Sequence, residues 1–302
     1  MVELFPGYYP FTRKQLKSFS KDATIVFGAS VLLDLYRISY WKVFLDIVER
    51  NNLQERLWLP YDTAWIYHNR LPQVIKSQLE EVKTAAKYLE QFKSKVDNPY
   101  GHPFISKDLI EQYNQFVIAV SESLNQDARY LIENLRHSEL KSKLSNLFND
   151  KVGIPYDESK MAQLYNEAKR LNMANKCPCL TISSSLDIRF QSNRYIIWKQ
   201  IQQHAKETGK PVLLVLNRIT PNWFDIYNDE TILPQHELIN EFKSGTGVDI
   251  HITTAYDFIK HFSGNHPNKA ELLHQLHNKP TLGNLQQIQI SNMDNQTNLI
   301  NG

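Results

Sequence analysis

The feature that most constrains the fold is an unbroken run of apolar residues, Val212–Leu216. A strand with one solvent-exposed face alternates apolar and polar residues, whereas an unbroken apolar run is typical of a strand that is covered on both faces. Short apolar stretches at Thr24–Phe27, 57–60 and 248–253 each precede a helical pattern in the same way. The sequence therefore predicts a three-layer α/β domain, a parallel sheet flanked by helices.

Two long helical patterns lie between the first and last of these strands. Apolar residues recur at steps of three and four over 64–96 and again over 107–148, and we expect the two segments to form an antiparallel helical hairpin. A shorter helix is expected over 158–172, followed by a loop that contains Ser183 to Ser185. We predict one domain over 1–277, with a helical insertion at 72–175 and a flexible, low-charge tail at 278–302.

The charge balance excludes a strong overall field. The chain of 302 residues has 34 basic and 32 acidic side chains and a formal net charge of +2, so any binding site for nucleic acid must be local. The N-terminus lacks the pattern of a signal peptide and no apolar run is long enough to span a bilayer, which indicates a cytoplasmic protein without a membrane partner. Cys177 and Cys179 are too close together for usual zinc spacing, and we expect reduced thiols.

Several segments, in their order along the chain, resemble the bacterial PIN-like domain family, which has a nuclease fold. The most specific are FPGYYP (5–10), IVFGASVLLDLYR (25–37) and RYIIWKQI (194–201); the others are LWLPYDTAWIYHNRL (57–71), PVLLVLNR (211–218) and LPQHELINEFKSGTG (233–247). The resemblance implies a parallel sheet with an active site at the carboxyl ends of the strands. In active members that site gathers Asp and Glu side chains around Mg²⁺ or Mn²⁺, which prefer oxygen ligands.

This chain departs from the family at each of those acidic positions. The first Asp of the family, directly after the first strand, corresponds to Gly28, and the Glu on the helix after the second strand corresponds to Ile66. The Asp before the IIW segment corresponds to Arg194, and the acid after the next strand to Asn217. A family Arg corresponds to Gln235. The resemblance therefore implies a catalytically degenerate member, with no catalytic residues at these positions and no metal cofactor.

Basic residues near the substituted positions are candidates for ligand binding. Arg194 and Arg218 sit at the ends of elements that converge at the site in the family fold, and guanidinium groups bind phosphate in a bidentate manner. His68 and Arg70 follow the position of the lost Glu and are further candidates. The alternative for all four is an ordinary packed, ion-paired or solvated side chain.

The main alternative function is an active nuclease with a displaced Mg²⁺ or Mn²⁺ site. Its metal ligands would be Asp34, Asp62 and Asp187, although Asp62 more simply caps the helix that it begins. The favoured prediction is a pseudo-nuclease that acts as a nucleic-acid-binding or regulatory subunit. The resemblance alone suggests a bacterial defence or toxin-control system. We expect a protein partner to bind the helical hairpin or the C-terminal tail.

Overall fold

A computed structural model describes residues 1, 3–9, 11, 19, 21–96, 105–179, 188–217, 219–227 and 231–277. Its elements are η1 Pro6–Tyr8, β1 Thr24–Phe27, α2 Ala29–Asp34, α3 Trp41–Arg50, η2 Leu53–Arg56, α4 Tyr61–Val96, α5 Lys107–Arg136, α6 Glu139–Leu147, α7 Glu158–Met173, α8 Ile188–Thr208, β2 Val212–Leu216, β3 Phe224–Tyr227, β4 Thr231–Pro234, α9 His236–Thr246, β5 Ile250–Thr254, α10 Ala255–Phe262 and α11 Lys269–His277. The chain divides into two compact units, 1–67 with 148–302, and 68–147. The helix α7, which the sequence analysis includes in the insertion, groups with the first unit.

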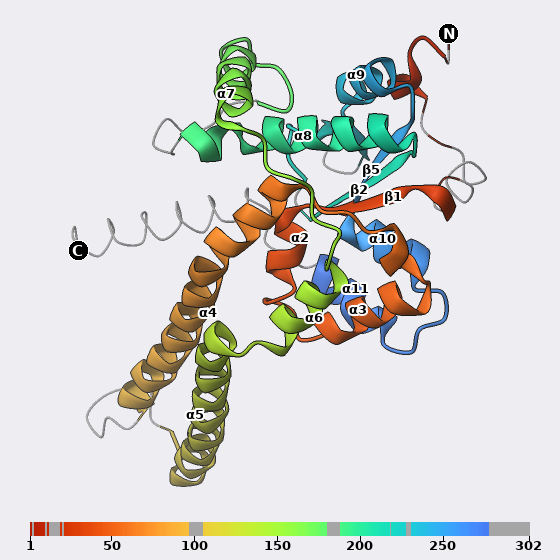
Figure 1. Ribbon diagram of the computed structural model, residues 1–302. Coiled ribbons are helices and arrows are strands. Elements are labelled where there is room, and N and C mark those ends of the chain that lie inside the picture. The colour runs from red at the N-terminus through yellow and green to blue at the C-terminus, as the bar shows by residue number, and fades with distance from the viewer. Residues whose placement is uncertain are drawn as a thin grey trace. The chain divides into compact units, whose positions relative to one another are not determined.

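A parallel sheet in the order β1-β2-β5 forms the centre of the first unit (Figure 1). Val26 pairs with Leu214, and Leu214 pairs with Ile252, so these three side chains form one row across the sheet. All residues of β1 and β2 are buried. The predicted α/β fold with a parallel sheet between helices is thus confirmed.

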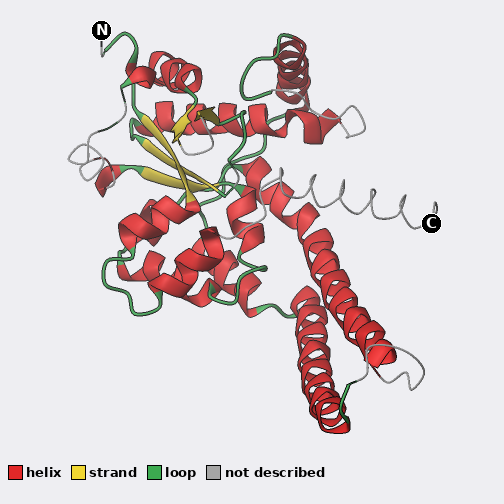
Figure 2. Cartoon of the chain, turned by 180° about the vertical axis from the view of Figure 1, so that it is seen from behind, coloured by secondary structure: helices red, strands yellow, loops and turns green. Residues whose placement is uncertain are grey.

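The helices α8 and α9 cover one face of the sheet, as seen from behind in Figure 2. Val26, Leu214 and Ile252 pack there with Trp198 of α8 and Phe242 of α9, whose ring centroids lie 5.3 Å apart. Both aromatic side chains are fully buried, and burial of such large rings is among the strongest contributions to a core. This contact holds α8, which carries several candidate site residues, against the sheet.

The helices α3 and α10 cover the opposite face. Phe27 of β1 packs against Phe44 of α3 and Phe258 of α10, with ring centroids 5.6 Å and 5.3 Å away respectively. The pair Phe27 and Phe258 meets edge to face, an arrangement that aromatic rings favour. Helices on both faces explain why the central strand β2 is apolar throughout.

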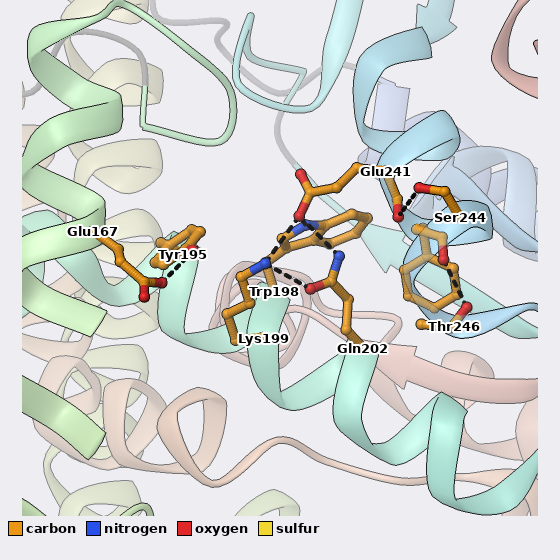
Figure 3. Close-up of polar contacts among 9 residues, drawn as sticks. Glu167, Tyr195, Trp198, Lys199, Gln202, Glu241, Ser244 and Thr246 are labelled. Carbon is orange, nitrogen blue, oxygen red and sulfur yellow. Dashed lines mark hydrogen bonds and ion pairs between the residues drawn. The ribbon is translucent and has the colours of Figure 1, made fainter. Parts of the chain in front are cut away.

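Polar contacts fasten α8 to its neighbours on the side away from the sheet (Figure 3). Glu241 of α9 accepts hydrogen bonds from Lys199 Nζ at 2.9 Å and Gln202 Nε2 at 3.0 Å. The Tyr195 hydroxyl donates to Glu167 of α7 at 2.7 Å. The position of α8 is therefore fixed by both apolar and polar contacts.

The second unit is helical, and α4 and α5 run side by side as the predicted hairpin (Figure 1). The Tyr113 hydroxyl donates to the Leu89 carbonyl at 3.0 Å, and the Phe92 ring meets that of Tyr113 edge to face at 5.1 Å. The expected single helical region over 107–148 is wrong in one respect, because it splits into α5 and α6. Ser138 lies at the break, and its hydroxyl accepts from the Lys141 amide as a cap.

The segment 57–60 does not form the expected strand. It makes only two isolated bridges, one between Leu57 and Ile25 and one between Leu59 and Val152. The ladder stops because Pro60 has no amide hydrogen and α4 begins at the next residue. The segment is nevertheless held firmly, since the Trp58 amide donates to the Ile25 carbonyl at 3.0 Å.

Some sequence-based expectations cannot be compared with this fold. The tail at 278–302 and the loop from Ser183 to Ser185 lie outside the described residues. The antiparallel pair β3 and β4 was not expected from the sequence. None of the described helices combines the length and apolar composition that a membrane crossing requires.

Candidate functional site

The carboxyl edge of the sheet begins with Gly28, directly after β1. The Gly28 amide donates to the Val215 carbonyl at 2.9 Å, and Gly28 caps the start of α2 in an extended conformation. A Cβ atom at Gly28 would lie 2.8 Å from Leu216 Cδ2, so the neighbouring side chain would have to move to accommodate any larger residue. The packing against β2 is thus built around glycine at this position.

Asp34, Arg37 and Asn217, hereafter the edge cluster, meet at the same edge. Asp34 on α2 is only 5% exposed, and its Oδ1 accepts from Arg37 Nη1 at 2.6 Å. Its Oδ2 accepts from Asn217 Nδ2 at 2.5 Å, and Asn217 directly follows β2. Both carboxylate oxygens therefore have a protein donor, and the negative charge of Asp34 is compensated by a guanidinium group.

Ile66 occupies the first turns of α4, and its side chain is half-buried. The next residue, Tyr67, is buried, and its hydroxyl lies 2.7 Å from that of Tyr36. Burial and this hydrogen bond raise the pKa of Tyr67 far above its usual range. Since Tyr36 lies two residues after Asp34, the tyrosine pair connects the edge-cluster segment to α4.

The residues at this edge do not fit a Mg²⁺ or Mn²⁺ site. Such ions need several oxygen ligands, usually carboxylates that are free to coordinate. Asp34 is the only carboxylate in the edge cluster, and its two oxygens already accept hydrogen bonds from Arg37 and Asn217. Within the described ranges, no group of three or more His, Cys, Asp and Glu side chains is arranged to hold a metal ion.

Asp62, Arg189 and Gln200, hereafter the pocket cluster, form a second buried polar group. Asp62 is 1% exposed; its Oδ1 accepts from Arg189 Nη2 at 3.3 Å and its Oδ2 from Gln200 Nε2 at 3.1 Å. Gln200 Oε1 in turn accepts from the Asp62 amide at 3.2 Å. Burial raises the pKa of Asp62 and outweighs the opposing effects of Arg189 and Gln200. Instead of the simple helix cap expected from the sequence, the carboxylate of Asp62 binds side chains of α8.

The pocket cluster borders a cavity of about 390 Å³. The guanidinium of Arg189 stacks on the Trp65 ring, with its carbon 3.6 Å from the ring centroid. The start of α4, the segment that leads into α7, the first half of α7 and the start of α8 contribute side chains to the wall. These lining residues are Tyr61, Asp62, Pro155, Tyr156, Glu158, Met161, Ala162, Tyr165 and Arg189. The cavity is thus aromatic, with charged groups of both signs.

Arg194 is half-buried on α8, and the ionisable group that acts on its pKa is the thiol of Cys179. Burial lowers the pKa of Arg194, and the positive charge of Arg194 partly opposes the effect of burial on Cys179, whose pKa rises to about 11. Cys179 is fully buried between α7 and α8. At neutral pH the thiol is uncharged, so it does not neutralise the guanidinium. A role for Arg194 in ligand binding stays a prediction.

The other candidate residues are placed as follows. His68 and Arg70 belong to the second compact unit; burial and Lys141 lower the pKa of His68, and Arg70 Nη1 donates to Gln73 at 3.2 Å. Arg218 and Asp187 lie outside the described residues. Their roles also stay predictions.

Comparison with known proteins identifies the family. A family model described as a PIN-like domain matches residues 24–238. The chain belongs to this family. No curated protein and no solved structure gives a significant match. The PIN-like chain therefore has a nuclease fold, and its edge cluster lies at the carboxyl edge of the parallel sheet, where the resemblance places the metal site of active members.

Most of the pocket cluster was not predicted from the sequence. Asp62 was a candidate residue, but Arg189 and Gln200, which are 127 and 138 residues further along the chain, were not. No motif spacing connects residues at such separations. The sequence contained only a weak signal for this cluster, which is that Asp62 lies at the start of a helix, beside aromatic residues, in a segment that resembles the family.

Proposed function

We propose that this PIN-like chain does not cleave nucleic acid by metal-dependent chemistry and acts as a nucleic-acid-binding or regulatory subunit. The observation that carries this proposal is the hydrogen bonding of the Asp34 carboxylate. Both of its oxygens accept hydrogen bonds, from Arg37 and Asn217, at the edge where a nuclease of this fold needs carboxylates for a cation. A guanidinium in this position supplies a positive charge but cannot generate an attacking hydroxide.

The geometry at Gly28 supports the same proposal. The Leu216 side chain lies so close that any side chain at Gly28 requires it to shift, so the first acidic position of the family is replaced by a close glycine contact. Ile66, with an aliphatic side chain, cannot coordinate a hard cation. The scaffold around these positions is still well packed, as we expect of a protein that folds stably but has a different function.

A nuclease assay tests the proposal directly. The purified chain is incubated with labelled RNA and single-stranded DNA in Mg²⁺ and, separately, Mn²⁺, and we expect no cleavage above a no-protein control. In parallel, calorimetric titration with Mn²⁺ is expected to show no saturable binding. Cleavage that is lost in Asp34→Asn or Asp62→Asn would instead establish the alternative, an active nuclease with displaced carboxylates.

The binding role has its own test. Electrophoretic mobility shifts with RNA and single-stranded DNA are measured over a range of salt concentrations, because phosphate contacts weaken as salt increases. We expect Arg194→Ala and Arg218→Ala each to reduce the affinity and the salt dependence, whereas Lys83→Ala, which removes an exposed lysine paired with Glu80, serves as the charge-matched control. Affinity that is unchanged in both arginine variants contradicts their role.

For a regulatory role, the relevant measurement is complex formation with the products of neighbouring genes. A bacterial defence or toxin-control system remains the setting we propose, and a protein partner is expected to contact the helical hairpin or the C-terminal tail. Size-exclusion chromatography of co-expressed proteins gives the answer. Failure of every neighbour to co-elute with the full chain contradicts this part of the proposal.

A further inference from the structure

The cavity beside the pocket cluster has the composition of a ligand site. At about 390 Å³ it falls within the range typical of small-molecule pockets, roughly 300 to 1,000 Å³. Three of its lining residues are tyrosines, Tyr61, Tyr156 and Tyr165, and all three side chains are half-buried. Aromatic walls of this kind provide apolar area and the negative faces of π systems, to which cations are attracted.

The charges of the wall do not cancel. Arg189 is held by the buried carboxylate of Asp62 at 3.3 Å, so this pair is internally compensated. Glu158 is exposed, and the part of the chain that the structure describes contains no ion pair to it. The cavity wall therefore has one excess negative charge, contributed by the carboxylate of Glu158.

Carboxylates other than Glu158 also act on Tyr156, which lines the cavity. The pKa of Tyr156 is raised to about 12, first by burial and then by the negative charges of Glu207 and Asp62. Ionisation of a phenol is opposed wherever the local potential is negative. This potential disfavours a phosphate or carboxylate group in the cavity and favours a positive one.

We infer that this cavity binds an organic cation, an alkylammonium or guanidinium group, against its tyrosine side chains, with Glu158 as the counter-charge. The protein already uses the same interaction next to the cavity, where the guanidinium of Arg189 stacks on Trp65 at 3.6 Å. The cation could come from a free polyamine or from a Lys or Arg side chain of a partner protein. This site is separate from the edge cluster and does not depend on the proposed loss of nuclease activity.

The test is calorimetric titration of the full chain with choline and with the carbon isostere of choline, in which a carbon atom replaces the nitrogen. The two probes have the same shape and differ in charge, so we expect choline to bind and the isostere to bind at least about threefold more weakly. Adenosine serves as a neutral, planar probe. All titrations are repeated at higher salt, which should weaken the binding of choline.

Two variants and matched controls assign the binding to this cavity. We expect Glu158→Gln to weaken choline binding about twofold to fivefold, as for an exposed charge pair. Tyr165→Leu keeps apolar bulk but removes a π face, and should weaken it about threefold to thirtyfold. Glu271→Gln, an exposed glutamate in the first turn of α11, is the control for the charge change and should bind as the wild type does. Thermal melting verifies that each variant is folded.

Several results overturn the inference. These are the absence of saturable choline binding, equal binding of choline and its isostere, wild-type affinity in Glu158→Gln, or tighter binding of adenosine than of choline. If Tyr165→Leu does not fold, Glu158→Gln and the isostere comparison still decide the question.

Further titrations distinguish the sources of the cation. Tighter binding of spermidine than of capped lysine or arginine amides indicates a free polyamine, and the reverse order indicates a side chain of a protein partner. Both orders support a cation site.

Discussion

The edge cluster and the pocket cluster are built from the same chemical parts but differ in their surroundings. Each contains a buried aspartate, an arginine and a carboxamide, and the two aspartates are 5% and 1% exposed. The hollow that Asp34 lines together with Val31, Leu35 and Phe44 has no room for a water molecule. Asp62, in contrast, borders a cavity of about 390 Å³.

The two clusters therefore differ in whether a cavity lies beside them. In the edge cluster, Arg37 and Asn217 donate to both carboxylate oxygens of Asp34, and these contacts stabilise the carboxyl edge of the sheet. In the pocket cluster, the same kind of pairing fixes Arg189 in a cavity wall. An equivalent set of interactions can therefore fill one part of a fold and shape the wall of a cavity in another.

The largest effect is expected from Asp62→Ala. The substitution removes the buried carboxylate that accepts from Arg189 and Gln200, and we expect the free energy of unfolding to fall by about 3 kcal/mol. This is the lower end of the usual range, because the Arg189 side chain is 30% exposed and retains some hydration. Urea denaturation followed by circular dichroism measures the change. A loss below that of an ordinary surface substitution would show that the pocket cluster is not a structural unit.

The variant Asp62→Asn isolates the charge of the same residue. Burial raises the pKa of Asp62 in the folded state, so between the unfolded-state value, about 4, and the folded-state value the folded protein binds more protons than the unfolded one. The contribution of this group to stability therefore decreases as pH rises through that window. We expect the wild type to show this decline from about pH 4 upward, and Asp62→Asn to lack it.

The second largest effect is expected from Asn217→Asp in the edge cluster. The substitution replaces a donor to Asp34 by a second carboxylate, and we expect a loss of about 2 to 3 kcal/mol at pH 7, equivalent to a pKa raised by about two units. Acidification should restore the stability, because one carboxyl of the pair is then protonated in the folded state. Denaturant midpoints at several pH values measure this.

Addition of Mn²⁺ to Asn217→Asp sharpens the comparison of the two clusters. The melting temperature of the variant is measured with and without Mn²⁺, and the change is compared with that of the wild type. If Mn²⁺ does not change either melting temperature, the edge has too few carboxylates to bind a cation. A clear increase in the variant alone means that a single substitution regenerates a cation site, which would weaken the view of the edge as a closed structural contact.

The sheet and most helices were predictable because their signals are local. The unbroken apolar run of β2 and the three-and-four periodicity of α4 are properties of short segments. The helix α3 was missed although its buried residues, among them Trp41, Phe44 and Val48, follow the same spacing. The break at Ser138 was also missed, because a serine cap within a helical pattern changes the apolar periodicity very little.

The candidate site was predictable only in part, because its contacts are long-range. The sequence directed attention to Gly28 and Asn217 through their positions after strands, and the structure places both at one edge of the sheet. The contact between Asp34 and Asn217 joins residues that are 183 apart, and the sequence alone had no means of pairing them. The shape of the cavity depends on α4, α7 and α8 together, which no local pattern describes.

A smaller effect is expected from Gly28→Ala at the edge. Its new methyl group would lie 2.8 Å from Leu216 Cδ2, and relief of this overlap by a side-chain shift should cost about 1 kcal/mol. The double variant Gly28→Ala with Leu216→Ala tests the cause, because it removes the overlapping atom. A double-mutant cycle by urea denaturation should give a favourable coupling between the two substitutions, whereas simple additivity of the two losses argues against a steric origin.

The smallest effect is expected from the tyrosine pair that connects the two regions. Tyr36 follows Asp34 by two residues and Tyr67 lies on the helix that Asp62 begins, so their hydroxyl contact at 2.7 Å joins the edge cluster segment to α4. Tyr36→Phe removes one partner and leaves the buried Tyr67 hydroxyl without this hydrogen bond, at a cost of about 1 kcal/mol. The double variant Tyr36→Phe with Tyr67→Phe removes both polar groups and should cost less than the two single losses combined. Denaturation of the four proteins measures this coupling, and a coupling of zero would mean that the two regions are stabilised independently of the tyrosine contact.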